Sequence, residues 1–156
     1  MALRQSEAEM EIRPYSEADK TAVIALWREI FPDAPPWNDP EADIHRKLRV
    51  QRELFLVATL RSELVGTAMA GYDGHRGWVY YVAVSPRHRR KGIGRNLMST
   101  LEGRLTQMGC SKVNLQVRGS NREVVRFYQR LGYQVEDRIS MGKPLRGSGI
   151  RTDIQL

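Results

Sequence analysis

Apolar and polar positions follow two different periods along this chain, and the changes of period mark the predicted elements. In the first half, residues 10–15 resemble a short strand. The apolar runs 54–60 and 64–70 are separated by a short polar turn, a pattern typical of a β-hairpin. A further apolar run, residues 78–84, follows a glycine-containing turn. These runs predict strands that pair mainly in antiparallel fashion.

Two helices are predicted between the first strand and the hairpin. Apolar residues recur at helical spacing over residues 23–30, and Ser16 followed by Asp19 is typical of an N-cap with acidic support. The proline-rich residues 32–38 predict a loop, because proline fixes φ and lacks an N–H donor. A second helix is expected from Asp39, with proline at its first position. Its predicted buried residues are Ile44, Leu48 and Val50.

The second half of the chain alternates helical and strand patterns. Residues 93–108 place apolar side chains on one helical face and stop at Gly109. Residues 112–118 alternate with period two, and residues 124–131 form another helical stripe. A last strand is predicted to begin at Tyr133 and to continue towards Met141. The pattern predicts an α/β (α+β) fold with a mixed, mostly antiparallel central sheet flanked by helices.

The length of 156 residues is enough for one domain with a substantial core. We expect this domain to span residues 10–143, after a flexible extension of residues 1–9 and before a C-terminal tail of residues 144–156. No apolar run approaches the roughly 20 residues of a membrane span, and the N-terminus lacks the apolar core of a signal peptide. The sequence therefore predicts a cytoplasmic protein that does not bind a membrane.

The single cysteine, Cys110, excludes an internal disulfide bond and fits a reducing cytoplasm. It follows Gly109 at a helix-to-strand junction, where a packing role is favoured over a nucleophilic one, because free cysteine usually behaves as a small buried hydrophobe. No His/Cys/Asp cluster has the spacing of metal ligands, so no metal is expected.

The charge of the chain favours an anionic partner. It has 25 basic and 18 acidic residues, a formal net charge of +7. Five of the basic residues lie within nine positions: Arg87, Arg89, Arg90, Lys91 and Arg95. A solvated face, a nucleic-acid patch and a phosphate pocket are the three alternatives. No aromatic residues are interleaved through the cluster, as a stacking platform for nucleic acid requires, so no nucleic-acid partner is expected.

The surroundings of this cluster favour the phosphate pocket. A strand over residues 78–84 leads into the basic turn, which contains Gly92 and Gly94 and opens the next predicted helix. Helix-initial N–H groups have no intrahelical partner and carry the positive end of the helix dipole, so they favour an anion. Glycine lets the backbone approach a ligand without a Cβ in the way. The order of strand, basic glycine turn and helix therefore predicts a pyrophosphate site.

Two motifs in this order resemble the GNAT superfamily of N-acetyltransferases. The family's pyrophosphate motif, Gln/Arg-x-x-Gly-x-Gly/Ala, is matched by residues 89–94. Its second signature, an Asn followed by an aromatic pair and then Gly-aromatic, is matched by Asn121, Phe127-Tyr128 and Gly132-Tyr133. The resemblance covers residues 10–143. It implies acetyl-CoA as a cosubstrate, an amine as the acceptor, and no metal; because family members tend to form dimers, it is also compatible with a homodimer.

The resemblance also implies which residues bind the cofactor. The strand that includes Val82, Ala83 and Val84 matches the segment whose backbone meets the pantetheine arm, and its free N–H and C=O groups can pair with an amide-bearing ligand as an added strand does. The N–H groups from Arg90 to Arg95 can hold the two phosphates, with Arg and Lys adding charge-assisted hydrogen bonds. The implied cofactor-binding residues are Val82, Ala83, Val84, Arg89, Arg90, Lys91, Gly92, Ile93, Gly94, Arg95, Asn121 and Tyr128.

Tyr128 is the catalytic residue that the resemblance implies, as the general acid that protonates the leaving thiolate. Periodicity alone favours a core role for Tyr128 between Val124 and Leu131, and the family match reverses that preference. Asn121 has two open roles, as a cofactor contact or as a helix-start residue beside a Ser120 cap. In relatives that resemble ribosomal-protein N-terminal acetyltransferases, a Glu serves as base where this chain has Gln116, which cannot take a proton at neutral pH.

The expected function is transfer of the acetyl group of acetyl-CoA to a primary amine, directly within a ternary complex. The loop 33–37, the second helix and the turn 72–75 are expected to shape the acceptor pocket. Carboxylates and aromatic rings suit an amine there; the candidates are Asp33, Trp37, Asp39, Glu41 and Asp73. The acceptor itself is not specified by these residues. The alternative function is a non-catalytic acyl-CoA-binding sensor module, which the substitution at Gln116 would favour.

Overall fold

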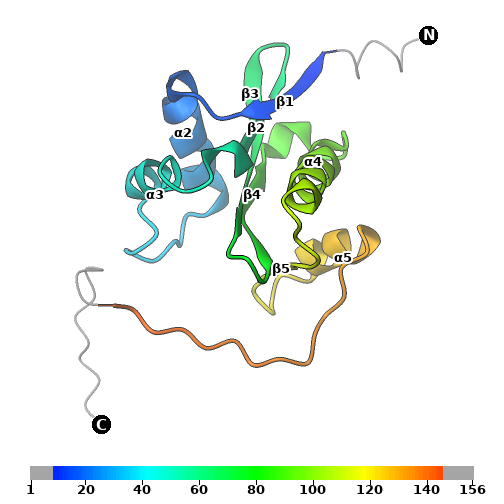
Figure 1. Cartoon of the computed structure of the whole chain (residues 1–156). Helices are drawn as coiled ribbons and strands as arrows, with labels where there is room; N and C mark the ends of the chain where they lie inside the picture. The colour runs from blue at the N-terminus through cyan, green and yellow to red at the C-terminus, as the bar shows by residue number, and fades with distance from the viewer. Residues whose placement is uncertain (1–8, 146–156) are drawn as a thin grey trace.

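The computed structural model describes residues 9–145 and has one five-stranded sheet in the order β1-β2-β3-β4-β5 (Figure 1). The first four strands pair antiparallel with their neighbours, and β5 pairs parallel with β4. The predicted α/β fold is confirmed. The strands are β1 (Met10–Pro14), β2 (Phe55–Leu60), β3 (Glu63–Tyr72), β4 (Gly77–Val84) and β5 (Val113–Leu115).

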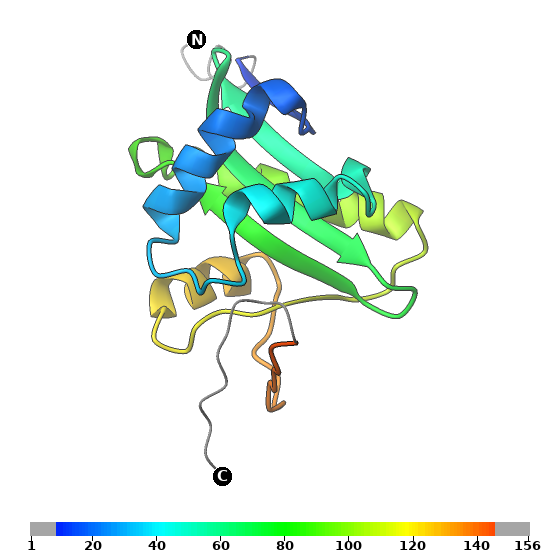
Figure 2. The same ribbon diagram turned by 90° about the vertical axis from the view of Figure 1, so that its left-hand side faces the viewer.

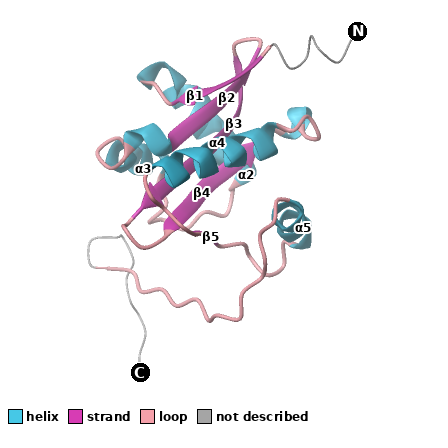
Figure 3. Ribbon diagram, turned by 45° about the vertical axis from the view of Figure 1, so that its right-hand side comes forward, coloured by secondary structure: helices cyan, strands magenta, loops and turns pink. Residues whose placement is uncertain are grey.

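Helices cover both faces of the sheet. In Figure 2, α2 and α3 cross the near face and α4 lies behind the strands; α5 lies near β5 on the side of α4 (Figures 1 and 3). The helices are α2 (Lys20–Ile30), α3 (Pro40–Lys47), α4 (Ile93–Gln107) and α5 (Arg122–Arg130). Short 3₁₀ turns precede α2 (Glu17–Asp19), β2 (Arg52–Leu54) and the basic turn (Pro86–His88). None of the helices among residues 9–145 is both long enough and apolar enough to cross a membrane.

Each face of the sheet has its own apolar core. On the α4 side, buried residues of β2, β3 and α4 form one cluster, which includes Leu56, Leu97 and Tyr128. On the α2 side, Trp27 and Phe55 belong to a second cluster. Strands buried on both faces explain why β2 reads as a continuous apolar run rather than as a strict alternation.

The predicted cap before α2 is present. The Ser16 backbone N–H donates to Asp19 Oδ2 at 2.8 Å, and the Arg13 guanidinium holds both Asp19 carboxylate oxygens at 2.7 and 2.8 Å. The hydrogen bonds from Arg13 lower the pKa of Asp19, while its burial opposes them. This arrangement joins β1 to the start of α2.

The predicted buried stripe of α3 is partly wrong. Ile44 is buried, but Val50 is exposed and lies beyond the end of the helix. Lys47 is buried instead, and its Nζ donates to the Ala70 carbonyl of β3 at 2.5 Å. A lysine can occupy this position because its long apolar stem packs under the helix while its ammonium reaches a backbone acceptor. Burial lowers the pKa of Lys47.

The predicted strand from Tyr133 to Met141 is wrong, and β5 is shorter than the expected 112–118. Residues 133–145 run alongside β5 as an extended loop (Figure 3). Only side chains link this loop to β5: Lys112 and Asn114 both donate to the Glu136 carboxylate, at 2.5 and 2.6 Å. A ladder needs backbones about 4.8 Å apart, which contacts between side chain ends do not provide. The alternating residues Val135, Ile139 and Met141 are therefore exposed.

The expected extension 1–9 and tail 144–156 lie almost wholly outside the described residues. Glu9 is described, and its carboxylate accepts from Arg61 Nε at 2.6 Å. The predicted packing role of Cys110 agrees with its surroundings, because its Sγ lies 3.0 Å from where a Cβ on Gly77 would be and donates to the Lys112 carbonyl at 3.3 Å.

We expect Tyr15→Phe to raise the free energy of unfolding by about 1–2 kcal/mol, since a buried hydroxyl without a hydrogen bond costs stability. Tyr15 stacks on Phe55 with centroids 4.6 Å apart, and its Oη is buried with no hydrogen-bond partner among the described residues. Urea denaturation followed by circular dichroism measures the change. Tyr72→Phe is the control, because the Tyr72 hydroxyl donates to the Gly109 carbonyl at 3.3 Å, and it should give no gain.

Candidate active site

The edge of β4 opens halfway along the strand. β4 pairs with β5 only over residues 77–79, opposite 113–115. On its other side it stays paired with β3 as far as Val84, opposite Gly66. Among the described residues, the part of β4 after Val79 thus has no strand partner on the β5 side. Backbone groups in this part, which includes the predicted Val82, Ala83 and Val84, face a gap that an extended ligand can fill by strand addition.

A β-bulge in β4 creates this opening. Thr67 pairs with Ala83 and Met69 with Tyr80, so β4 has one residue more than β3 between these pairs. Tyr81 sits in the bulge with φ of +52°, a left-handed conformation that costs energy for a residue with a Cβ. Its carbonyl accepts from Thr67 Oγ1 at 2.8 Å, and Thr67 Oγ1 in turn accepts from Trp27 Nε1 at 2.9 Å. These buried hydrogen bonds hold the bulge in place.

The basic turn between β4 and α4 leaves the first N–H groups of the helix without a partner within the helix. Arg90 and Gly92 have φ of +64° and +76°, which reverses the chain before α4. The first hydrogen bond of α4 runs from the Asn96 N–H to the Gly92 carbonyl at 3.0 Å. The N–H groups of residues 93–95 therefore have no partner within the helix and form an anion site at its positive end.

Side chains of the predicted pyrophosphate motif divide into two groups. Four basic residues are exposed, and none forms an ion pair within residues 9–145; they are Arg89, Arg90, Lys91 and Arg95. Ile93 and Gly94 are buried, so they can offer a ligand only their backbone. A Cβ on Gly94 would lie 3.0 Å from Phe127 and 3.6 Å from Val84, which explains why glycine is needed where α4, α5 and β4 meet.

Tyr128 lies on α5 and packs in the same core cluster as Val82 and Val84. Its ring makes edge contacts with Phe127 and Tyr133, with centroids 5.0 and 5.7 Å apart. Burial raises the pKa of Tyr128 to about 12. The ring thus contributes to the core, and the phenol keeps its proton at neutral pH; the role of Tyr128 as general acid stays a prediction.

Asn121 occupies the position before the first residue of α5, so the helix begins one residue later than the expected Ser120 cap. Its side chain is exposed and makes no capping hydrogen bond. The amide is thus available to a ligand beside the start of α5.

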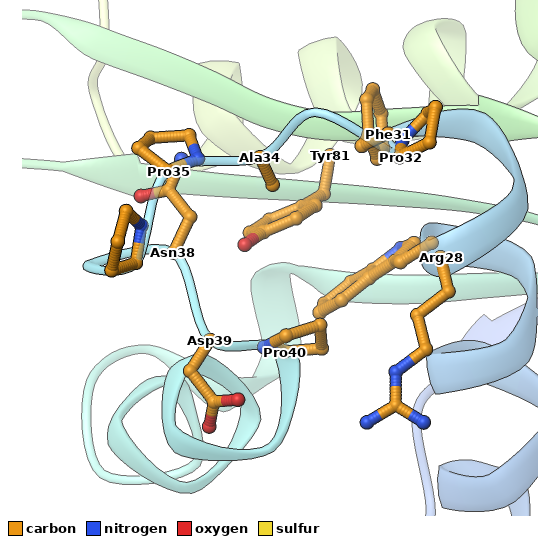
Figure 4. Close-up of a pocket in the computed structure, with 11 residues that line it drawn as sticks. Arg28, Phe31, Pro32, Ala34, Pro35, Asn38, Asp39, Pro40 and Tyr81 are labelled. Carbon is orange, nitrogen blue, oxygen red and sulfur yellow. The ribbon is translucent and has the colours of Figure 1, made fainter.

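A pocket of about 350 Å³ lies on the α2 face of β4 (Figure 4). Its walls are the C-terminal part of α2, the loop up to α3, and Tyr81. Most of the lining is aromatic or proline: Trp27, Phe31, Tyr81, Pro32, Pro35, Pro36 and Pro40. Ala34 also lines it, and the polar lining residues are Arg28, Asn38 and Asp39.

Only one of the predicted acceptor candidates, Asp39, lines this pocket. Glu41 pairs with Lys20 at 2.8 Å, and Asp73 accepts from the His75 and Arg76 N–H groups in the β3–β4 turn. Gln116 directly follows β5, does not line this pocket, and donates to Ser140 Oγ. Sequence reasoning missed Tyr81 and Phe31. The loop prediction for residues 32–38 pointed to the region, but no residue pattern indicates that β4 bulges towards it.

The fold and the site define a class of protein. It is a mixed α/β domain with one apolar core on each face of its sheet. One strand edge lies open beside a helix start that can bind an anion. The sequence model of the "Acetyltransferase (GNAT) family" matches residues 20–133. An acetyltransferase of Pectobacterium atrosepticum is 48% identical over 136 residues, which span 87% of this chain and 96% of that protein. The chain therefore belongs to the GNAT family, and the predicted family and the enzyme class, N-acetyltransferase, are confirmed.

Solved structures of similar fold agree with this assignment. Ard1 from Thermoplasma volcanium superposes with a TM-score of 0.72 at 26% identity, covering 82% of this chain and 84% of that one. The structure of yncA from Salmonella typhimurium with its cofactor acetyl-CoA has a TM-score of 0.69 at 23% identity, covering 86% and 88%. The likeness to yncA is one of fold.

Proposed function

We propose that this enzyme binds acetyl-CoA along the open edge of β4 and transfers its acetyl group directly to a primary amine in a ternary complex. The observation that supports this most strongly is the combination of the free edge after Val79 with the N–H groups of residues 93–95, which have no partner within the helix. A pantetheine arm has amides that suit the first, and a pyrophosphate suits the second. The exposed basic residues Arg89, Arg90, Lys91 and Arg95 supply the remaining positive charge.

The twelve cofactor-binding residues of the sequence prediction are retained in this proposal, with their contacts specified. Val82, Ala83, Val84 and Ile93 contribute backbone groups, since the Ala83 and Ile93 side chains are buried in the two cores. Asn121 contributes its free side-chain amide. We further propose that residues 10–143 form the functional domain and that the enzyme works in the cytoplasm, where acetyl-CoA is abundant.

The reaction that we propose consists of bond changes at the thioester and two proton transfers. The amine nitrogen attacks the thioester carbon, a C–N bond forms, and the C–S bond then breaks. Tyr128 donates a hydrogen bond to the departing sulfur and then its proton, while the surplus proton of the amine leaves through ordered water. The pKa of about 12 exceeds that of a thiol, about 8.5, by roughly 3.5 units. Transfer of the phenolic proton to the thiolate is therefore uphill even after the C–S bond has broken, so the hydrogen bond from Tyr128 acts first, and the phenolate then regains its proton from water.

This proposal assigns no carboxylate as the general base, because Gln116 stands where some relatives have a Glu. An amine that arrives in its neutral form, or water that removes its proton, completes the reaction. The acceptor enters from the opposite face of β4, through the pocket of Figure 4. Donor and acceptor then meet at the bulge from two sides of the sheet, as direct transfer requires.

Titration calorimetry with acetyl-CoA tests the proposal, with two variants that add the same charge at glycines of left-handed backbone, one before and one after α4. Gly92→Asp places a carboxylate at the start of α4, where it should repel the pyrophosphate and weaken acetyl-CoA binding at least about tenfold. Gly109→Asp adds its carboxylate at an exposed position beyond the other end of α4, with φ of +89° and no atom within 4 Å of the new Cβ, so it carries the same backbone strain and should stay within about twofold of the parent.

Equal affinities for the two variants, or no binding by the parent protein, would contradict the proposal. Thiol release with a panel of amines completes the test, because the alternative function as a sensor module predicts binding of acetyl-CoA with no turnover on any of them.

A further inference from the structure

The pocket on the α2 face carries no surplus of negative charge. One cation, Arg28, and one carboxylate, Asp39, line it. The Asp39 carboxylate is already engaged, because it accepts from the Ala42 N–H at 3.0 Å and caps α3. A polyamine or an aminoglycoside carries several positive charges, and each would need a carboxylate to replace its hydration. The walls of this pocket instead suit a compact apolar body, since aromatic and proline residues predominate.

Tyr81 is the polar group that projects from β4 into this pocket (Figure 4). Its hydroxyl donates its single proton to Asp43 Oδ2 at 2.5 Å, and Asp43 Oδ1 accepts from Arg46 at 2.6 Å. A phenolic oxygen whose proton is engaged can only accept further hydrogen bonds. Tyr81 Oη therefore selects for a ligand with N–H donors and against one that presents an acceptor.

The Tyr81 side chain is held in one orientation, so it can discriminate between ligands that donate and ligands that accept a hydrogen bond. Its ring stacks on Trp27 with centroids 3.8 Å apart and meets Phe31 edge-on at 5.7 Å. Its backbone is fixed by the hydrogen bond to Thr67 described above. Burial and the neighbouring Asp43 raise the pKa of Tyr81, so the phenol keeps its proton and the direction of its hydrogen bond.

From these observations we infer that the acceptor is a single primary amine on a compact apolar or aromatic body, whose N–H group is received by Tyr81 Oη. This inference rests on the proposed function and names the substrate class for the same site. Asp43 is a positioning residue in this arrangement, because it acts through Tyr81 and is not among the residues that line the pocket.

The test measures binding rather than turnover, so that its failure differs from failure of the proposed function. 2-Phenylethylamine and spermidine are titrated separately into protein saturated with CoA. We expect 2-phenylethylamine to bind and spermidine to bind at least about tenfold more weakly. Tyr81→Phe keeps the ring but loses the oxygen, and it should weaken 2-phenylethylamine at least about tenfold, the usual effect of losing a hydrogen bond to a charged group.

Tyr80→Phe is the matched control, because Tyr80 is the neighbouring tyrosine of β4, is 53% exposed and does not line the pocket. It should stay within about twofold of the parent. The inference is overturned if spermidine binds as well as 2-phenylethylamine, if 2-phenylethylamine fails to bind, or if Tyr81→Phe and Tyr80→Phe behave alike. Each of these results leaves CoA binding intact, whereas loss of CoA binding would instead contradict the proposed function.

Discussion

Tyr128→Phe should lower kcat about 100-fold or more while the affinity for acetyl-CoA changes less than about twofold. The phenol supplies the proton that the leaving thiolate needs, and general acid catalysis commonly contributes 10²–10⁴-fold. A factor of 100 corresponds to about 2.7 kcal/mol of transition-state stabilisation. The ring itself keeps its contacts with Phe127 and Tyr133, so the fold should tolerate the change. Steady-state kinetics and calorimetry with acetyl-CoA separate the two quantities.

Tyr133→Phe is the control for this variant. Tyr133 contacts the Tyr128 ring, but its hydroxyl is turned to Glu102 Oε2 at 3.2 Å. Loss of the Tyr133 hydroxyl should leave kcat within about threefold of the parent. Equal losses of kcat and acetyl-CoA affinity in Tyr128→Phe would assign Tyr128 to packing alone.

The pH dependence of kcat supplies a further check on Tyr128. An acid acts only while it holds its proton, so its contribution is lost as the pH rises through its pKa. With that pKa raised to about 12 by burial, kcat should show no loss due to Tyr128 up to about pH 10. A decrease near pH 8 that disappears in Tyr128→Phe would show that the phenol ionises much earlier and would contradict this account.

Trp27→Ala should lower the free energy of unfolding by about 3–5 kcal/mol, the usual cost of removing a large buried aromatic side chain. Trp27 is 1% exposed, stacks on Tyr81 and Phe55, and donates from Nε1 to Thr67. Because a domain of this size is typically stable by only 5–15 kcal/mol, much of its stability would be lost. Urea denaturation followed by circular dichroism gives the value.

Trp27→Phe separates packing from the hydrogen bond. It retains an aromatic ring and removes only the Nε1 donor and part of the ring volume, so it should cost about 1–2 kcal/mol. If both variants cost less than about 1 kcal/mol, the aromatic cluster around Tyr81 contributes little to the fold, and the rigidity that we ascribe to Tyr81 would have no basis.

The hydrophobic periods predicted most of the elements because each depends on local residues. The α2 helix begins after a Ser16/Asp19 cap and ends before Pro32, and α4 ends at Gly109, which has φ of +89°. The last strand was predicted wrongly for a physical reason. Alternation over residues 135–141 tells which side chains share a face, but a strand also needs a backbone partner, and that partner depends on tertiary geometry.

The candidate site could be predicted where it is continuous in sequence. The basic turn and the start of α4 follow one another directly, and a short motif is enough to indicate their use. The pocket that we propose for the acceptor brings residues 27–40 together with Tyr81 of the β4 bulge, which lies more than 40 positions further along the chain. A tyrosine with φ of +52° has no sequence signature, since glycine or asparagine is the usual residue in that conformation.

The left-handed backbone of Tyr81 also bears on how this enzyme can be engineered. Asparagine or glycine at position 81 would relieve a local strain of about 1–2 kcal/mol, yet either would remove the ring that stacks on Trp27 and the hydroxyl that we place in the acceptor pocket. Selection for heat resistance alone should therefore already disfavour both substitutions, because losing a packed aromatic ring costs about 3–5 kcal/mol, more than the relieved strain. Selection that couples heat resistance to turnover should retain tyrosine there and place its gains elsewhere, because the strain and the recognition reside in one residue.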